Sequence, residues 1–118
     1  FVAFGGLPLA NGQMGNGGTG RHVQREGFVA AVEAGVQFVN VSPRRLDMDS
    51  PATPEWLPIR PNSDTAMILA LCHTLRAEGL ADEEFLDSHC TGYEPFAAYL
   101  DGTVDGVPKD AFWAAALT

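Results

Sequence analysis

The stretch Val36-Gln37-Phe38-Val39-Asn40-Val41, read VQFVNV, carries the clearest secondary-structure signal in the chain. Its β-branched and aromatic side chains favour a strand. Gly35 precedes it and Pro43, which has no N–H to donate to a ladder, follows it closely. The pattern predicts a buried strand over residues 36–41.

Further strands and helices are expected on both sides of this stretch. Phe1–Phe4 reads as a buried strand that ends at two glycines. Glu55–Ile59 reads as a short strand, for which Pro58 favours an edge position or a brief ladder. Helices are expected over Arg21–Ala34, Thr65–Glu78, Asp82–His89 and Tyr93–Leu100, and from Lys109 onward. Strands that alternate with helices predict an α/β fold: a parallel sheet with helices on both faces, in three αβα layers. We therefore expect a Rossmann-like cofactor-binding domain followed by small helices.

The expected organisation is one α/β domain over residues 1–118. Within it, residues 1–80 would form a nucleotide-binding βαβ core and residues 81–118 a helical extension. The chain begins inside an apolar run without an initiator Met and stops inside an expected helix, Phe112–Thr118. We expect it to be an internal piece of a larger protein.

Composition excludes several classes of function. Of the 118 residues 46% are hydrophobic, and the formal net charge is −8 without a basic cluster beyond Arg44-Arg45. A nucleic-acid surface needs a basic footprint, and no apolar run reaches membrane-spanning length. Each of the two cysteines, Cys72 and Cys90, sits beside a histidine, but adjacent helical positions diverge too far to share a metal, so no metal site is expected.

The segment Gly15–Gly20, read GNGGTG, matches the G-x-G-x-x-G fingerprint of dinucleotide-binding folds. A functional fingerprint follows a strand directly, opens a helix, and has an acid at the end of the next strand. Residues 10–14 do not read as a strand, and no acid lies at Asn40–Ser42. A flexible glycine loop is the favoured interpretation, and an NAD(P)-binding Rossmann half is kept as an alternative.

A ligand of an open parallel sheet binds outside the carboxyl ends of its strands. Three such ends can be read from the sequence: Phe4-Gly5-Gly6-Leu7-Pro8, Val41-Ser42-Pro43-Arg44 and Arg60-Pro61-Asn62-Ser63-Asp64. The glycines allow the backbone to approach a ligand closely, and the serine offers a hydroxyl. The arginine guanidinium can bind a phosphate through two parallel N–H groups. The last carboxylate can pair with the ring N–H and amino group of guanine, which adenine lacks.

Each of these features also has a plain structural interpretation. Gly5-Gly6 can be only a turn, Ser42-Pro43 only the end of a strand, and Asp64 only a helix cap. Their succession at three strand ends favours a nucleotide pocket. A non-catalytic interaction module, with an apolar patch for a partner, stays open as a further alternative.

Two segments resemble the molybdopterin oxidoreductases of the dimethyl sulfoxide reductase family. The first contains VQFVNVSPRRLD and EWLPIRPNSDTAMILALCHTL, and the second is the tail EGLADEEFLDSHCTGYEPFAAYLDGTVDGVPKDAFWAAALT. The resemblance of the tail includes the Thr91-Gly92-Tyr93 turn and the Lys109–Ala114 segment. The resemblance is strongest to the branch of biotin sulfoxide, trimethylamine N-oxide and dimethyl sulfoxide reductases.

The resemblance implies an α/β domain that holds one arm of a bis(molybdopterin guanine dinucleotide) cofactor with molybdenum. Phe4, Gly5, Gly6, Leu7 and Pro8 would lie near the cofactor. Ser42, Pro43 and Arg44 would meet ribose or phosphate. Asn62, Ser63 and Asp64 would hold the guanosine, with the carboxylate on the base.

This sequence departs from the family at two places. The family often has Trp where this chain has Phe4, and Gln-Thr-Asp or Gly-Thr-Asp where it has Asn62-Ser63-Asp64. The molybdenum ligand lies outside this stretch in the family, and neither Cys72 nor Cys90 matches it, so we expect no activity, and no retained cofactor, in the piece alone.

The resemblance also implies partners. They are the remaining domains of the parent enzyme. Composition predicts neither nucleic acid nor membrane as a partner. With its alanine-rich end, Phe112–Leu117, exposed, the isolated piece is expected to be a homodimer or a weakly stable monomer. The bacterial compartment, cytoplasm or periplasm, is not given by the sequence.

Overall fold

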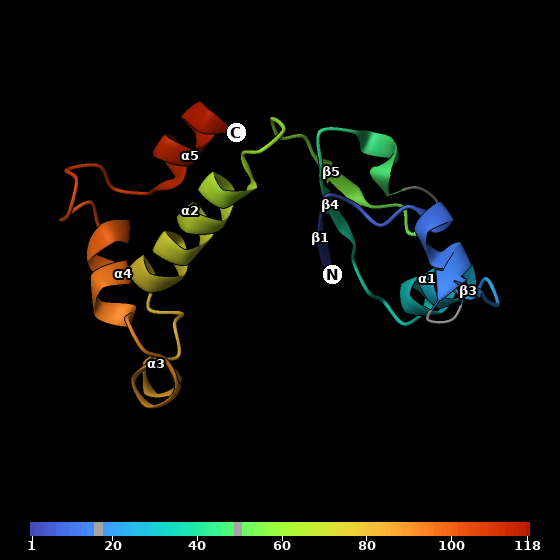
Figure 1. The fold of residues 1–118 in the computed structure, drawn as a ribbon, viewed down its shortest axis with the longest axis horizontal. Coiled ribbons are helices and arrows are strands. Elements are labelled where there is room, and N and C mark those ends of the chain that lie inside the picture. The colour runs from blue at the N-terminus through green and yellow to red at the C-terminus, as the bar shows by residue number, and fades with distance from the viewer. Residues whose placement is uncertain (16–17, 49–50) are drawn as a thin grey trace. The chain divides into compact units, whose positions relative to one another are not determined.

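The computed structural model describes residues 1–15, 18–48 and 51–118 (Figure 1). These residues form two compact units, Phe1–Pro61 and Asn62–Thr118, which are described separately below. The boundary between the units falls earlier than residue 80, where the nucleotide-binding core was expected to end. The division into a core and a helical extension stays a prediction.

The first unit contains a three-stranded sheet built from β1 (Val2–Phe4), β4 (Val39–Val41) and β5 (Glu55–Leu57). The strand order is β1-β4-β5, and both neighbouring pairs are parallel. The expected α/β class and parallel pairing are therefore confirmed. β5 lies at an edge of the sheet, as Pro58 immediately after it predicted.

β4 is shorter than the sequence suggested, because it begins at Val39 and not at Val36. The register pairs Val2 with Val39, the first residues of β1 and β4. The Val39 N–H reaches the Phe1 carbonyl at 2.8 Å.

The segments expected to be loops contain short regular elements. A 3₁₀-helix, η1 (Leu9–Gln13), leads into an antiparallel pair of two-residue strands, β2 (Met14–Gly15) and β3 (Gly18–Thr19). A second 3₁₀-helix, η2 (Arg45–Asp47), follows β4. α1 spans Gln24–Glu33 and so begins three residues later than expected.

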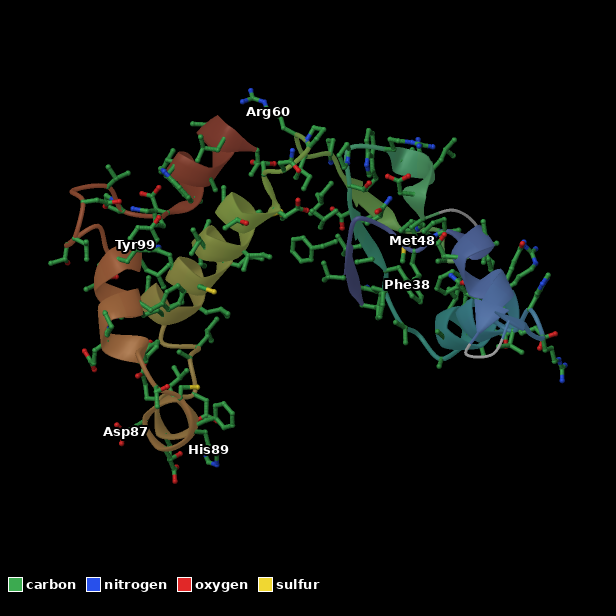
Figure 2. The ribbon with its side chains drawn as sticks, viewed as in Figure 1. Phe38, Met48, Arg60, Asp87, His89 and Tyr99 are labelled. Carbon is green, nitrogen blue, oxygen red and sulfur yellow. The ribbon has the colours of Figure 1, made fainter. Side chains whose placement is uncertain are left out.

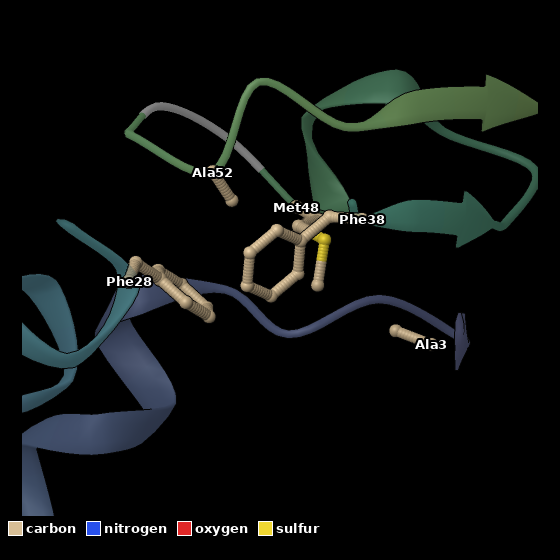
Figure 3. Close-up of a cluster of buried hydrophobic side chains, with 5 residues drawn as sticks. All are labelled: Ala3, Phe28, Phe38, Met48 and Ala52. Atoms are coloured by element: carbon tan, nitrogen blue, oxygen red, sulfur yellow. The ribbon is translucent and has the colours of Figure 1, made fainter. Parts of the chain in front are cut away.

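A small apolar core holds the first unit together (Figure 3). Its buried members are Ala3, Phe28, Phe38, Met48 and Ala52. The Phe28 ring, from α1, meets the Phe38 ring edge-on with 5.5 Å between centroids, a favourable aromatic geometry. This cluster ties α1 to the segment before β4 and to the chain after η2.

The helices are divided unequally between the two units. Of the five α-helices in the described residues, α1 alone belongs to the first unit. The other four belong to the second unit. The three-layer arrangement with helices on both faces of the sheet, and its Rossmann-like character, remain predictions.

The second unit is helical. Its helices are α2 (Asp64–Ala77), α3 (Glu83–His89), α4 (Tyr93–Leu100) and α5 (Ala111–Leu117), and α2 packs against α4 and α5. Asp82 and Asp110 cap the amino ends of α3 and α5, and their carboxylates accept from the N–H groups of Phe85 and Trp113, each at 2.9 Å. The expected helices of this part are therefore confirmed within one or two residues.

None of the helices in residues 1–15, 18–48 and 51–118 is both long and apolar enough to cross a membrane.

Candidate functional site

The carboxyl ends of the three parallel strands lie at one edge of the sheet. The register places Phe4, Val41 and Leu57 side by side, so the residues that follow them leave the sheet together. The Gly5 N–H donates to the Val41 carbonyl at 2.9 Å, and the Ser42 N–H donates to the Leu57 carbonyl at 3.2 Å. The structure thus brings the first two predicted strand ends together within the first unit.

The loop after β1 contains five of the predicted site residues. Phe4 and Gly5 are exposed, whereas Gly6, Leu7 and Pro8 are half-buried. Both glycines have left-handed backbones, with φ of +81° and +80°, which side chains rarely tolerate. The Leu7 N–H donates to the Asp47 carbonyl at 2.7 Å, while no hydrogen bond is found for the Gly6 N–H within the described part of the chain.

The turn after β4 contains three more predicted residues. Ser42 is fully buried, and its hydroxyl donates to the Asp47 carboxylate and accepts from the Arg44 N–H at 3.3 Å. The hydroxyl therefore faces the protein in this conformation. Pro43 is exposed, and the Arg44 side chain, 74% exposed, presents its guanidinium to solvent.

Polar groups outside the predicted set hold this turn in place. The buried Asn40 amide nitrogen lies 3.5 Å and 3.2 Å from the carbonyls of Arg44 and Arg45, and the Trp56 indole N–H donates to the Ser42 carbonyl at 2.9 Å. Arg44 Nε lies 3.5 Å from an Asp47 carboxylate oxygen. The Asn40 side-chain oxygen is buried and has no hydrogen-bond partner among the described residues.

The third predicted set lies at the start of the second unit. Asp64 is the first residue of α2 and is half-buried, Ser63 is buried, and Asn62 is exposed. Asn62 has a φ of +67°, a left-handed conformation that asparagine adopts more readily than most residues. These residues belong to a different unit from the first two loops, so a joint site remains a prediction.

Two hollows are lined by residues outside the predicted site set. One, of about 490 Å³, is in the second unit and is lined mainly by apolar residues, among them Leu75, Phe85 and Phe96. Another, of about 350 Å³, is in the first unit beside Val39 and Glu55, which begin β4 and β5. The second hollow is thus at the amino ends of the strands, opposite the edge predicted to bind a nucleotide.

The GNGGTG segment does not have the expected context of a dinucleotide fingerprint. Asn16 and Gly17 lie outside the described residues. Gly15 belongs to a two-residue antiparallel strand preceded by a 3₁₀-helix, and α1 begins only at Gln24. These features agree with the interpretation of the segment as a glycine loop.

The cysteines are both free thiols in this structure. Cys72 is half-buried in α2, and Cys90 is exposed at the end of α3. Within residues 1–15, 18–48 and 51–118, no group of three or more His, Cys, Asp or Glu side chains could hold a metal ion.

Sequence reasoning missed Asp47 and Asn40. Asp47 falls in a segment taken as a plain loop, and Asn40 in a strand judged by its apolar neighbours. One signal was available for the acid: it follows Arg44 by three residues, a spacing at which opposite charges meet on a helical turn.

The structure is that of an α/β protein with a parallel sheet, and the Gly5-Gly6 loop and the Ser42–Arg44 turn lie at one edge of that sheet. Comparison with known proteins identifies its relatives. The chain is 40% identical over 118 residues to biotin sulfoxide reductase of Cereibacter sphaeroides, covering all of this chain and 16% of that protein. It is 38% identical over 94 residues to dimethyl sulfoxide/trimethylamine N-oxide reductase of the same organism, covering 80% of the chain and 11% of the relative.

A similar match is found to trimethylamine-N-oxide reductase 1 of Escherichia coli, at 50% identity over 60 residues, 51% of this chain and 7% of the relative. The chain therefore belongs to the dimethyl sulfoxide reductase family of oxidoreductases, for which a molybdenum–molybdopterin cofactor is implied. It spans about a sixth or less of the length of these relatives. No family model matches the chain.

Proposed function

We propose that this chain binds one guanine dinucleotide arm of a bis(molybdopterin guanine dinucleotide) cofactor in a molybdenum enzyme that reduces S- or N-oxides. The observation that carries the proposal is the shared carboxyl edge of β1 and β4, where the Gly5-Gly6 loop and the Ser42–Arg44 turn lie side by side. Ligands of parallel sheets bind at this position. The names of the relatives support the reaction class.

The groups at this edge fit the phosphates of a dinucleotide. The exposed Arg44 guanidinium can pair with phosphate oxygens through two parallel N–H groups. The Gly6 N–H makes no hydrogen bond within the described residues and can serve as a backbone donor. The positively charged Arg44 guanidinium and the backbone N–H donor of Gly6 favour an anionic ligand over a neutral one.

The proposed contact of Asn62–Asp64 is with the guanosine. Asp64 would accept the ring N–H and the amino group of guanine, with the left-handed Asn62 directing the chain into α2. Adenine would leave this carboxylate without its two donors, so the site would prefer guanine. Ser42, buried in this conformation, would act by shaping the turn.

The cofactor, when bound, supplies the metal chemistry, which transfers one oxygen atom and two electrons. The residues of this chain would bind and orient one arm of it. We expect no turnover from the 118 residues alone, because in the family that this chain resembles the residue that ligates molybdenum lies outside this stretch.

Guanine recognition can be tested by calorimetric titration of the chain with GDP and with ADP. We expect saturable binding of GDP, tighter than that of ADP. The Asp64→Asn substitution replaces an acceptor oxygen with an NH₂ group and should weaken GDP about tenfold or more, while leaving ADP unchanged.

Glu78→Gln, at the far end of α2, is the matched control and should bind as the unsubstituted chain does. Equal affinity for GDP and ADP, or unchanged GDP affinity in the Asp64 variant, would contradict the guanine role. Tight saturable binding of NADH instead would favour a nicotinamide site.

A further inference from the structure

We propose that Asp47 is the positioning residue of this edge: it joins the β1 loop to the β4 turn and aims the Arg44 guanidinium at the phosphates. The proposal rests on the function proposed above. Asp47 lies at the end of η2 and was in none of the sets of site residues predicted from the sequence. It is the residue through which both strand-end loops are connected.

The first connection runs through the Asp47 backbone. Its carbonyl accepts the Leu7 N–H at 2.7 Å. A Cβ atom on Gly6 would lie only 2.6 Å from the carbonyl carbon of Asp47, so the two chain segments are in direct contact. This close approach holds the β1 loop against η2.

The second connection runs through the Asp47 side chain. One carboxylate oxygen accepts the hydroxyl of the fully buried Ser42, and the other lies 3.5 Å from Arg44 Nε. The turn is closed further by the Asp47 N–H, which donates to the Arg44 carbonyl at 3.2 Å. Asp47 thus contacts the beginning and the middle of the turn at once.

The contact between Asp47 and Arg44 leaves the terminal nitrogens of the guanidinium free. A guanidinium has five N–H groups, one on Nε and four on the two terminal nitrogens. The contact with Asp47 is made by Nε, and within the described residues no other acid pairs with Arg44. The terminal nitrogens remain available for bidentate contact with a phosphate.

This arrangement reduces the cost of binding. An exposed arginine has many rotamers, and fixing it on a ligand costs conformational free energy. Asp47 limits those rotamers before the ligand arrives, while Ser42 and Arg44 compensate its own charge. Asp47 therefore acts on the phosphate through Arg44 and is not itself a ligand contact.

The test compares guanosine with GDP, because only GDP carries phosphates. In the unsubstituted chain GDP should bind more tightly than guanosine, and the ratio of the two affinities measures the phosphate contribution. Asp47→Asn keeps the shape and the acceptor for Ser42 but removes the charge that orients Arg44. We expect GDP affinity to fall about tenfold, with guanosine affinity unchanged.

The matched control is Glu26→Gln, which removes an exposed ion pair of similar length, 3.6 Å to Arg21, elsewhere in the same unit. It should leave the ratio of affinities as it is. In a chain that already carries Arg44→Gln, Asp47→Asn should have no further effect on GDP, because the group it orients is gone.

Three results would overturn the inference. An equal loss of guanosine and GDP affinity in Asp47→Asn would show that Asp47 has a purely structural role. An unchanged ratio in Asp47→Asn would remove its role in positioning while leaving the proposed function intact. An unsubstituted chain that binds no GDP would instead refute the proposed function, and the inference with it.

If Asp47→Asn fails to fold, the unsubstituted chain answers the same question by NMR. The Arg44 Nε–H should exchange slowly before GDP is added and keep its chemical shift afterwards, while the terminal N–H signals shift. A large shift of the Nε–H signal on GDP binding would show that the phosphate displaces Asp47, and would overturn the proposal.

Discussion

At the scale of single residues, the two glycines after β1 have different reasons for being glycine. Gly5 and Gly6 share a left-handed backbone, which an L side chain adopts at a cost. Around Gly5 the space that a Cβ would occupy is empty, whereas at Gly6 it is filled by the backbone and Cβ of Asp47. Only the second glycine is required by a neighbour 41 positions away in the sequence.

The pair makes a matched experiment on stability. Gly5→Ala should lower the free energy of unfolding by about 1 kcal/mol, from backbone strain alone. Gly6→Ala adds steric overlap with Asp47 and should lower it by about 2–4 kcal/mol. Urea denaturation of both variants measures the difference, and equal losses would show that Gly6 and Asp47 do not touch in solution.

At the scale of elements, Lys109 links α4 to α5 across the loop of residues 101–108. Its side chain is 2% exposed, its ammonium donates to both carboxylate oxygens of Asp105 at 2.9 Å and 2.7 Å, and it lies 4.2 Å from the centre of the Tyr99 ring. The Tyr99 side chain is labelled in Figure 2. The hydrogen bond from Lys109, followed by the one from the Val107 N–H, holds the pKa of Asp105 below its ordinary value.

This link predicts a pH dependence of stability. A carboxyl group whose pKa is lowered in the folded state stabilises the fold above its unfolded pKa, and that contribution is lost as pH falls through the lower, folded value. Asp105→Asn should therefore destabilise the chain near neutral pH, and the difference from the unsubstituted chain should shrink below about pH 4.

Thermal unfolding of both proteins across this pH range measures the effect. The exposed Asp87→Asn serves as the control. A difference that stays constant with pH would contradict the charge-based account of the Lys109 link.

At the scale of the whole molecule, charge is distributed unevenly along the chain. Residues 1–61 hold five acidic and five basic side chains, whereas residues 62–118 hold ten acidic and two basic ones. Both basic side chains of the second unit, Arg76 and Lys109, already pair with acids. The net charge of −8 therefore resides in the helical unit, which also exposes large apolar side chains such as Phe112, 88% exposed.

These two features make opposite contributions to self-association. An exposed apolar helix favours a dimer, as expected for the Phe112–Leu117 segment, while eight negative charges on each copy oppose it. We predict weak dimerisation that becomes stronger as salt screens the repulsion. Sedimentation velocity at low and high salt measures it.

Phe112→Ser should abolish the dimer, whereas Phe85→Ser, at the apolar hollow, should not. A monomer at high concentration in high salt would contradict the prediction, and so would dimerisation that persists in Phe112→Ser.

Local sequence determined much of this protein without help from the fold. The apolar run of Phe1–Phe4, the VQFVNV stretch and the Pro58 signal gave a parallel sheet with β5 at its edge, because propensity and missing N–H donors act within a few residues. The local sequence likewise predicted α3 and α4 nearly to the residue. The family could also be recognised from the sequence, because contiguous motifs define the resemblance.

Only the tertiary structure decided how those pieces meet. The pairing of β1 with β4 sets the register of the sheet, and the contact between Gly6, Leu7 and Asp47 follows from that register. The burial of Ser42 and the contact between Arg44 and Asp47 depend on the same register. Residues forty positions apart become neighbours only after the strands have paired, and no local pattern in either segment records which partner it will find.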